Sequence, residues 1–219
     1  MTNTLHRYGN AESFADDYVI FAIPCKGKNE KGAVEKLRLF LTICEKHEPT
    51  NMGNSDFGSH RPSEKLGPSV HWKREVGPDF DGVVRGVHRT ATAAAVFDSS
   101  EKAEACLREL IDTDLGLSVN VSASVDGAKA LARECGNARH SVEYSLGFFD
   151  RHDRLPDRRV LELSTMCGHG MVSSNLAKKM LDMVREGRRS PEEAAVTMAR
   201  FCPCGVYNPT RAKRLLEEG

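Results

Sequence analysis

Two short motifs in the last quarter of the chain combine metal-binding side chains with a backbone that can turn tightly. The first, C-G-H-G, carries Cys167 and His169, and the second, C-P-C-G, carries Cys202 and Cys204. Each motif places two soft ligands one residue apart and ends in glycine, which tolerates the conformations needed close to an ion. Thiolates and imidazole are ligands of zinc and of iron–sulfur centres. The sequence therefore predicts one shared metal site built from these four side chains.

The ligand set fits two kinds of centre. Three thiols and one imidazole make a Cys₃His set, which suits zinc. The three cysteines alone could instead hold three irons of a [4Fe–4S] cluster, with His169 at the fourth iron or with that position open to substrate. Because the ligand pairs are tight and the cysteine content indicates a reducing cytosol, we expect an iron–sulfur cluster first and zinc as the alternative.

Both ligand pairs directly precede a predicted helix, one beginning near Ser173 and the other at Asn208. Helix N-termini carry partial positive charge and unpaired N–H groups, which favour thiolate over thiol and stabilise an anionic centre. Basic side chains nearby add positive charge and indicate a small anionic substrate: Lys178, Lys179, Arg200 and Arg211.

These features are compatible with three functions. The first is a metal- or iron–sulfur-dependent enzyme, a lyase or oxidoreductase, in which His169 is the fourth ligand or a general acid/base beside an open metal position. The second is a module without catalysis whose structural zinc site folds the C-terminal helices. The third is a thiol redox or metal-transfer protein that uses Cys202 and Cys204, which would have to be exposed.

The other cysteines divide into packing residues and one ambiguous position. Cys44, Cys106 and Cys135 fall on apolar faces of predicted helices, so we expect them in the core. Cys25 ends the first predicted strand, where it could be a nucleophile, a remote ligand or a packed turn residue. The chain has 7 cysteines, and an odd number in a reducing compartment argues against a disulfide framework.

Hydrophobic periodicity predicts alternating strands and helices in the first two thirds of the chain. The predicted strands are 17–24, buried on both faces, 91–97, 117–123 and 142–146; the predicted helices are 33–47, 99–112 and a short one around 128–135. This β-α-β-α-β order favours an α/β fold with a parallel or mixed sheet covered by helices. A ferredoxin-like α+β sandwich is the alternative.

A stretch rich in Gly, Pro, Ser and Asn, residues 48–88, reads as a long loop. Loops of this length in compact domains are often lids or binding loops, and a surface insertion is the other interpretation. As a lid it could bring His60 or His71 to the metal site. A short strand at 83–87 is expected within it.

Beyond residue 150 the strand pattern gives way to helices, with strong helix starts at Ser190 and Asn208, each followed by proline. We therefore predict an α/β domain over 1–150 with the long loop 48–88, and a helical Cys/His metal-binding unit over 151–219.

Composition and charge narrow the classes of molecule that the protein is expected to bind. A formal net charge of +0 argues against nucleic acid, and a hydrophobic fraction of 40% is ordinary for a globular chain. No apolar stretch approaches the roughly 20 residues of a membrane span, and the first residues lack a signal-peptide core. A cytoplasmic protein without membrane contact is expected. Phosphate-loop, dinucleotide-binding, zinc-protease and nucleophile-elbow motifs are missing, and the oligomeric state is not predicted.

Overall fold

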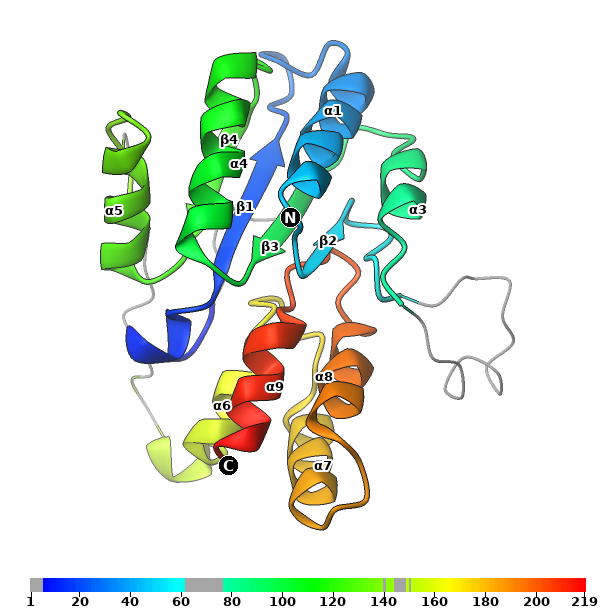
Figure 1. Cartoon of the computed structure of the whole chain (residues 1–219), viewed down its shortest axis with the longest axis vertical. Helices are drawn as coiled ribbons and strands as arrows, with labels where there is room; N and C mark the ends of the chain where they lie inside the picture. The colour runs from blue at the N-terminus through cyan, green and yellow to red at the C-terminus, as the bar shows by residue number, and fades with distance from the viewer. Residues whose placement is uncertain (1–5, 62–76, 140, 144–148, 150) are drawn as a thin grey trace.

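A computed structural model describes residues 6–61, 77–139, 141–143, 149 and 151–219. Its centre is a sheet of four strands in the order β2-β3-β1-β4, and every adjacent pair is antiparallel (Figure 1). The strands are β1 (Tyr18–Ile23), β2 (Asn51–Gly53), β3 (Ala93–Phe97) and β4 (Ser118–Ser122). With helices packed on this antiparallel sheet, the fold belongs to the α+β class.

The antiparallel sheet corrects the expectation of an α/β fold with a parallel or mixed sheet. Each β-α-β crossover joins two strands that run in the same direction, but a third strand lies between them: β3 separates β1 from β2, and β1 separates β3 from β4. Apart from the short helix between β2 and β3, residues 80–85, the chain order is β-α-β-β-α-β, and with this strand order it is compatible with the ferredoxin-like alternative.

One face of the sheet is covered by two long helices, α1 (Ala33–Lys46) and α4 (Ser100–Thr113). Every second residue of β1 and β3 points to them, so that Ile20 and Ala95 share a core with Phe40 of α1. Two shorter helices, α3 (Phe80–Arg85) and α5 (Val125–Glu134), flank this layer (Figure 1).

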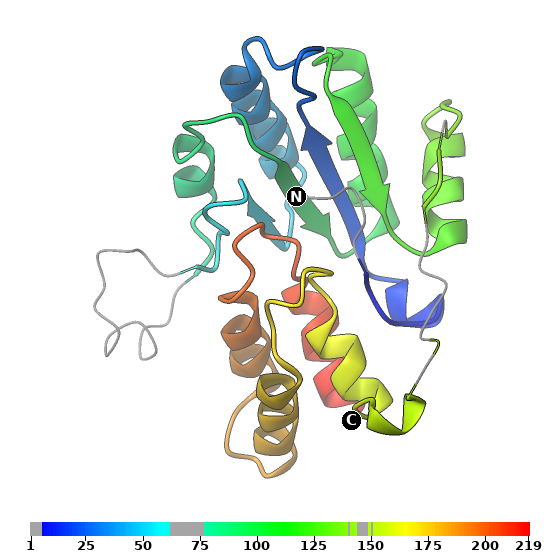
Figure 2. The same ribbon diagram turned by 180° about the vertical axis from the view of Figure 1, so that it is seen from behind.

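The other face of the sheet packs against the C-terminal helices. Val19 and Phe21 of β1 and Val96 of β3 share a second core with them. These helices are α6 (Arg158–Ser164), α7 (Ser174–Arg185), α8 (Pro191–Ala199) and α9 (Pro209–Glu217), and they gather at one end of the sheet (Figure 2). Strand β1 is therefore buried on both faces, as its continuous apolar sequence predicts.

The helix starts are set by the residues that the sequence indicates. Ser99 caps α4, Ser190 forms a capping box with Glu193 at α8, and the Asn208 side chain accepts from the Arg211 N–H at α9. The helices predicted from periodicity are thereby confirmed. The boundary between the two predicted units, near residue 150, is not tested and stays a prediction.

The structure differs from the sequence prediction at two points inside the long loop 48–88. Strand β2 is not predicted, and the strand predicted at 83–87 is wrong, because these residues belong largely to α3, whose Asp79 cap accepts from the Gly82 N–H. Val83 and Val84 alone would favour a strand, but the cap that Asp79 provides to the Gly82 N–H favours a turn of helix here. His71 lies outside the described residues, as does most of the strand predicted at 142–146, of which 142 and 143 carry no regular structure.

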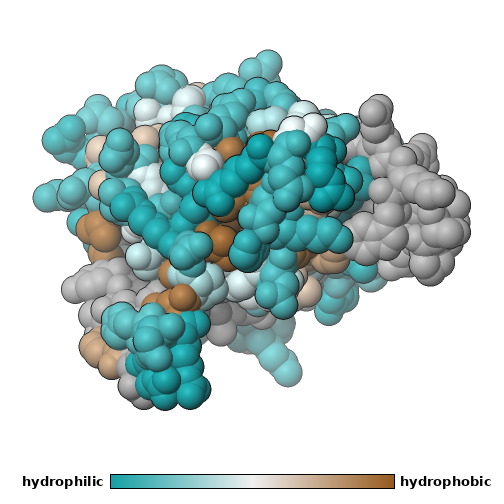
Figure 3. All heavy atoms as spheres, turned by 90° about the horizontal axis from the view of Figure 1, so that it is seen from below, coloured by the Kyte–Doolittle hydropathy of each residue, from teal (hydrophilic) through white to brown (hydrophobic). Residues whose placement is uncertain are grey.

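The end of the molecule formed by the C-terminal helices presents a mostly hydrophilic surface (Figure 3). Among the described helices, none is long and apolar enough to span a bilayer. A 3₁₀ turn, Glu12–Phe14, precedes β1, and another, His152–Arg154, precedes α6.

Candidate metal centre

The four side chains of the two motifs lie together. The sulfurs of Cys202 and Cys204 are 3.6 Å apart, and the Cys204 sulfur is 3.3 Å from Nδ1 of His169. The Cys167 thiol hydrogen-bonds with Cys202. Three sulfurs and one imidazole from two separate loops are thus connected through consecutive contacts.

The local fold explains how each motif presents its ligands. Cys167 follows α6 in a turn closed by the Gly168 N–H, which donates to the Thr165 carbonyl at 2.8 Å. Cys202 follows α8 in a similar turn, where its own N–H donates to Ala199. Both views of the ribbon show the loop after α6, in yellow, beside the loop after α8, in orange (Figures 1 and 2).

The second motif lies directly against the edge strand β2. A Cβ atom on Gly205 would come within 2.0 Å of the Met52 carbonyl carbon, and one on Gly53 within 2.5 Å of the Cys204 carbonyl carbon. A Cβ atom on Gly58 would likewise come within 2.5 Å of the carbonyl oxygen of Cys202. Real Cβ atoms do not tolerate such separations, so glycine is needed for the backbones to touch. The contact fixes the position of Cys202 and Cys204 relative to the sheet.

Polar contacts reinforce the same junction. The Asn51 side-chain amide donates to the Tyr207 carbonyl at 2.7 Å, and the Ser59 hydroxyl donates to Asn51 at 2.8 Å. All three residues are buried. Because buried polar groups are costly unless paired, this network holds the loop after α8 in one register against β2.

The sulfurs are withdrawn from solvent. Cys167 is 0%, Cys202 1% and Cys204 3% exposed. The hydrogen bond with Cys202, together with burial, raises the pKa of Cys167, and burial raises the pKa of Cys202 to about 12. The pKa of Cys204 is lowered, because the Cys202 thiol hydrogen-bonds to its thiolate. A lowered pKa favours the thiolate form of Cys204, which is the form that binds a cation.

The two separations at Cys204 are close to the edges of a tetrahedral metal site. Metal–sulfur bonds of about 2.3 Å and metal–nitrogen bonds of about 2.0–2.1 Å give S···S edges of about 3.8 Å and S···N edges of about 3.6 Å. The observed 3.6 and 3.3 Å are slightly shorter. In the described part of the chain, however, no group of three or more His, Cys, Asp or Glu side chains meets the geometry of a metal site as it stands. The contacts run in sequence from Cys202 through Cys204 to His169, so the side chains would have to rearrange to surround one ion.

His169 is half-buried and has one ring nitrogen still to satisfy. Its Nδ1 faces the Cys204 sulfur, while its Nε2 is buried and has no hydrogen-bond partner among the described residues. His60, the other candidate histidine, contacts the Thr50 carbonyl through Nε2 at 3.3 Å. Burial lowers the pKa of His60, so its ring is kept neutral.

A buried ionic group lies close to the first motif, and its role was not foreseen from the sequence. Asp17 Oδ2 accepts from the guanidinium of Arg7 and, at 2.7 Å, from that of Arg211. Asp17 and Arg211 are fully buried, and the Arg7 side chain is 3% exposed. Arg7 also interacts electrostatically with Cys167. A polar N-terminal arm and a basic residue on α9 gave no sequence signal that they would meet in the interior.

The remaining cysteines are placed away from these contacts. Cys44 on α1 and Cys106 on α4 are fully buried with their sulfurs 3.7 Å apart, which confirms them as core residues. Cys135 is only half-buried and contacts the Glu104 carbonyl. Cys25 is exposed in the turn after β1, where the Asn29 side chain accepts from its N–H.

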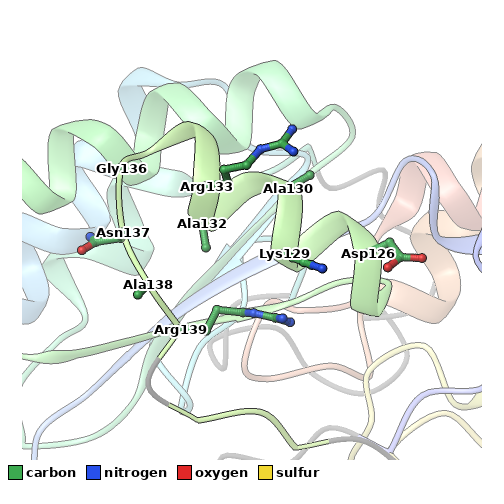
Figure 4. Close-up of a pocket in the computed structure, with 9 residues that line it drawn as sticks. All are labelled: Asp126, Lys129, Ala130, Ala132, Arg133, Gly136, Asn137, Ala138 and Arg139. Carbon is green, nitrogen blue, oxygen red and sulfur yellow. The ribbon is translucent and has the colours of Figure 1, made fainter.

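An open depression with a volume of about 750 Å³ lies beside α5 (Figure 4). Its wall is formed by α5 and the segment after it, and it contains Lys129, Arg133 and Arg139 but neither cysteine nor histidine. It shares no residue with the two motifs.

Comparison of the chain with protein-family models, with curated proteins and with solved structures finds no match.

Proposed function

We propose that Cys167, His169, Cys202 and Cys204 hold one metal ion, with zinc as the best fit. The observation that carries this proposal is the pair of separations at Cys204: 3.6 Å to the Cys202 sulfur and 3.3 Å to the His169 nitrogen. Both are close to the edges of a tetrahedron around a single ion. Three thiols and an imidazole complete a Cys₃His set.

The same separations favour one ion over the iron–sulfur cluster that the motifs first suggest. A [4Fe–4S] cluster gives each thiolate its own iron, so its ligand sulfurs stand farther apart than sulfurs that share one ion. Cys202 and Cys204 would have to move apart to bind it. The cluster is retained as the alternative cofactor, and colour distinguishes it from zinc.

A structural role is favoured by burial and by the neighbours of the ligands. The three sulfurs are at most 3% exposed, and structural zinc sites are closed in this way. One ligand pair follows α6, and the other follows α8 and touches β2. An ion bound to both pairs would fasten the C-terminal helices to each other and to the sheet edge.

A catalytic role is the second candidate, and His169 is the observation that favours it. Its ring is half-buried and its Nε2 has no partner among the described side chains, so it could hold or transfer a proton beside a metal bound by the cysteines alone. The substrate in that case would be small and anionic. A thiol redox role is less well supported, because it requires an exposed pair and Cys202 and Cys204 are buried.

Metal content tests the proposal. The protein is purified without oxygen, and its zinc, iron and visible spectrum are measured per chain for the wild type, Cys204→Ser and the exposed control Cys25→Ser. We expect one zinc per chain in the wild type and in the control, and a large loss in Cys204→Ser. A brown protein containing iron would show that the site holds the cluster and not zinc. A wild-type protein without bound metal would refute both.

A further inference from the structure

A single buried carboxylate, that of Asp17, anchors the N-terminal arm, residues 7–17, in the interior. Asp17 binds two guanidiniums, Arg7 from the start of the arm and Arg211 from α9. Arg211 also donates to Ser13 at 2.8 Å and to the Tyr8 carbonyl at 3.3 Å. Both guanidiniums lie over the Phe14 ring, at 5.0 and 4.2 Å from its centre. The arm is thus wrapped around two buried arginines.

This buried group carries unbalanced charge. Two guanidiniums against one carboxylate leave one positive charge in the interior. The Nε groups of Arg7 and Arg211 are buried and lack partners among the described atoms. A buried charge without compensation is costly, so a neighbouring negative charge would stabilise this arrangement.

The arm and the first ligand motif are adjacent. The Tyr8 N–H donates to the Thr165 hydroxyl at 2.9 Å, two residues before Cys167. Tyr207, which is fully buried, interacts electrostatically with Cys167, Arg211 and Asp17. The excess positive charge therefore lies within electrostatic range of the metal ligands.

We propose that the N-terminal arm is part of the metal site: Arg7 is a positioning residue whose charge compensates the metal–thiolate centre, so that metal binding and docking of the arm depend on each other. This inference rests on the proposed metal site. A divalent ion with three thiolates and a neutral imidazole carries one net negative charge, which matches the one buried positive charge. By linkage, whatever the arm adds to metal affinity, the metal adds to the stability of the docked arm.

The test compares two arginines that both hold the arm. Arg7→Gln removes the buried charge, and Arg214→Gln removes the half-exposed pair with Asp16 while leaving the buried charge intact. Zinc affinity is measured by competition with a coloured chelator, and hydrogen exchange of amides 8–17 is followed with and without metal. We expect Arg7→Gln to weaken zinc binding by about 10- to 100-fold, as for other residues that support metal ligands. Arg214→Gln should change it less than about threefold, and Arg7→Lys should restore most of the loss.

Hydrogen exchange gives the reciprocal result. In the wild type, removal of zinc should speed exchange of the arm, and in Arg7→Gln the metal should no longer slow it. Equal zinc affinity in Arg7→Gln and wild type, or an arm that exchanges at the same rate with and without metal, would overturn the inference while leaving the metal site intact. A wild type that binds no zinc would instead remove the proposed function itself. Circular dichroism verifies that each variant is folded.

Discussion

The two faces of the sheet each bury a pair of cysteine sulfurs at nearly the same separation. Under α1 and α4, Cys44 and Cys106 are 3.7 Å apart, and beside the C-terminal helices Cys202 and Cys204 are 3.6 Å apart. All four side chains are at most 3% exposed. Neither burial nor distance separates a packed pair of cysteines from a candidate ligand pair.

The backbone conformation and the surrounding charges distinguish the packed pair from the candidate ligand pair. Cys44 and Cys106 sit within helices, where their neighbours are apolar and the pKa of Cys44 is raised by burial. Cys202 and Cys204 lie in a turn, where Cys204 contacts an imidazole, and the neighbouring Cys167 interacts electrostatically with the buried Arg7. A thiol on a helix face packs as a small apolar group. Side chains of neighbouring residues in a turn can instead converge on one point.

Removal of metal should affect the two faces of the sheet most unequally. A strong chelator should leave the α1/α4 face intact and loosen the C-terminal face, with a loss of stability on the order of 5 kcal/mol, since structural zinc can contribute more than that in small domains. Iodoacetamide labelling read by mass spectrometry should then reach Cys167, Cys202 and Cys204 while Cys44 and Cys106 remain protected. Simultaneous labelling of all five would mean that the faces unfold together.

The glycines of the two motifs differ in how closely they are packed. Gly205 and Gly170 both have positive φ, 68° and 69°. Gly205 is packed against Met52, whereas nothing lies within 4 Å of a Cβ on Gly170. Gly205→Ala should cost more than about 4 kcal/mol because backbone must move, and Gly170→Ala about 1–2 kcal/mol from φ alone. Urea unfolding measures both, and equal losses would show that the contact with β2 does not hold the turn.

Truncation of the packed pair should have a smaller effect. Cys106→Ala removes one buried sulfur from the α1/α4 face and should lower the free energy of unfolding by about 1–2 kcal/mol through the cavity it leaves. Metal content should be unchanged, in contrast to Cys204→Ala, which should lose the metal. Loss of zinc from Cys106→Ala would place this pair in the metal site and end the distinction between the faces.

The smallest effect is expected from pH. Burial lowers the pKa of His60, so the folded state favours the neutral ring and the unfolded state binds its proton near pH 6.5. The contribution of the neutral His60 ring to the free energy of unfolding is therefore fully present above that pH. It falls as the pH drops below it, by at most about 1.4 kcal/mol per pH unit for one proton. The difference in unfolding free energy between wild type and His60→Gln should shrink as the pH falls from 7.5 to 5.5. A constant difference would mean that His60 does not set this slope.

Local features of this fold were predictable, and long-range pairings were not. The spacing of Leu37, Phe40 and Leu41 predicts α1, and Ser190 with its proline and glutamate predicts the start of α8. The strand order was not predictable, because a β-α-β sequence looks the same whether its strands are adjacent or separated by a third. Strand β2 is only three residues long and carries no period.

The site shows the same division. The two motifs identify candidate ligands because cysteine, histidine and glycine recur at a spacing that a turn can use. The pairing of Asp17 with Arg211 spans 194 positions and involves residues that are ordinarily exposed. Nothing local marks them as buried, so only the folded chain reveals the charge beside the motifs.

The proposed zinc centre is tested most directly by X-ray absorption at the zinc edge of the purified protein. Binding by Cys167, Cys202, Cys204 and His169 predicts three sulfur atoms at about 2.3 Å and one nitrogen at about 2.0–2.1 Å from the metal. Cys106→Ala should give the same spectrum. A shell of nitrogen and oxygen alone, or sulfur coordination that persists in Cys204→Ser, would contradict it.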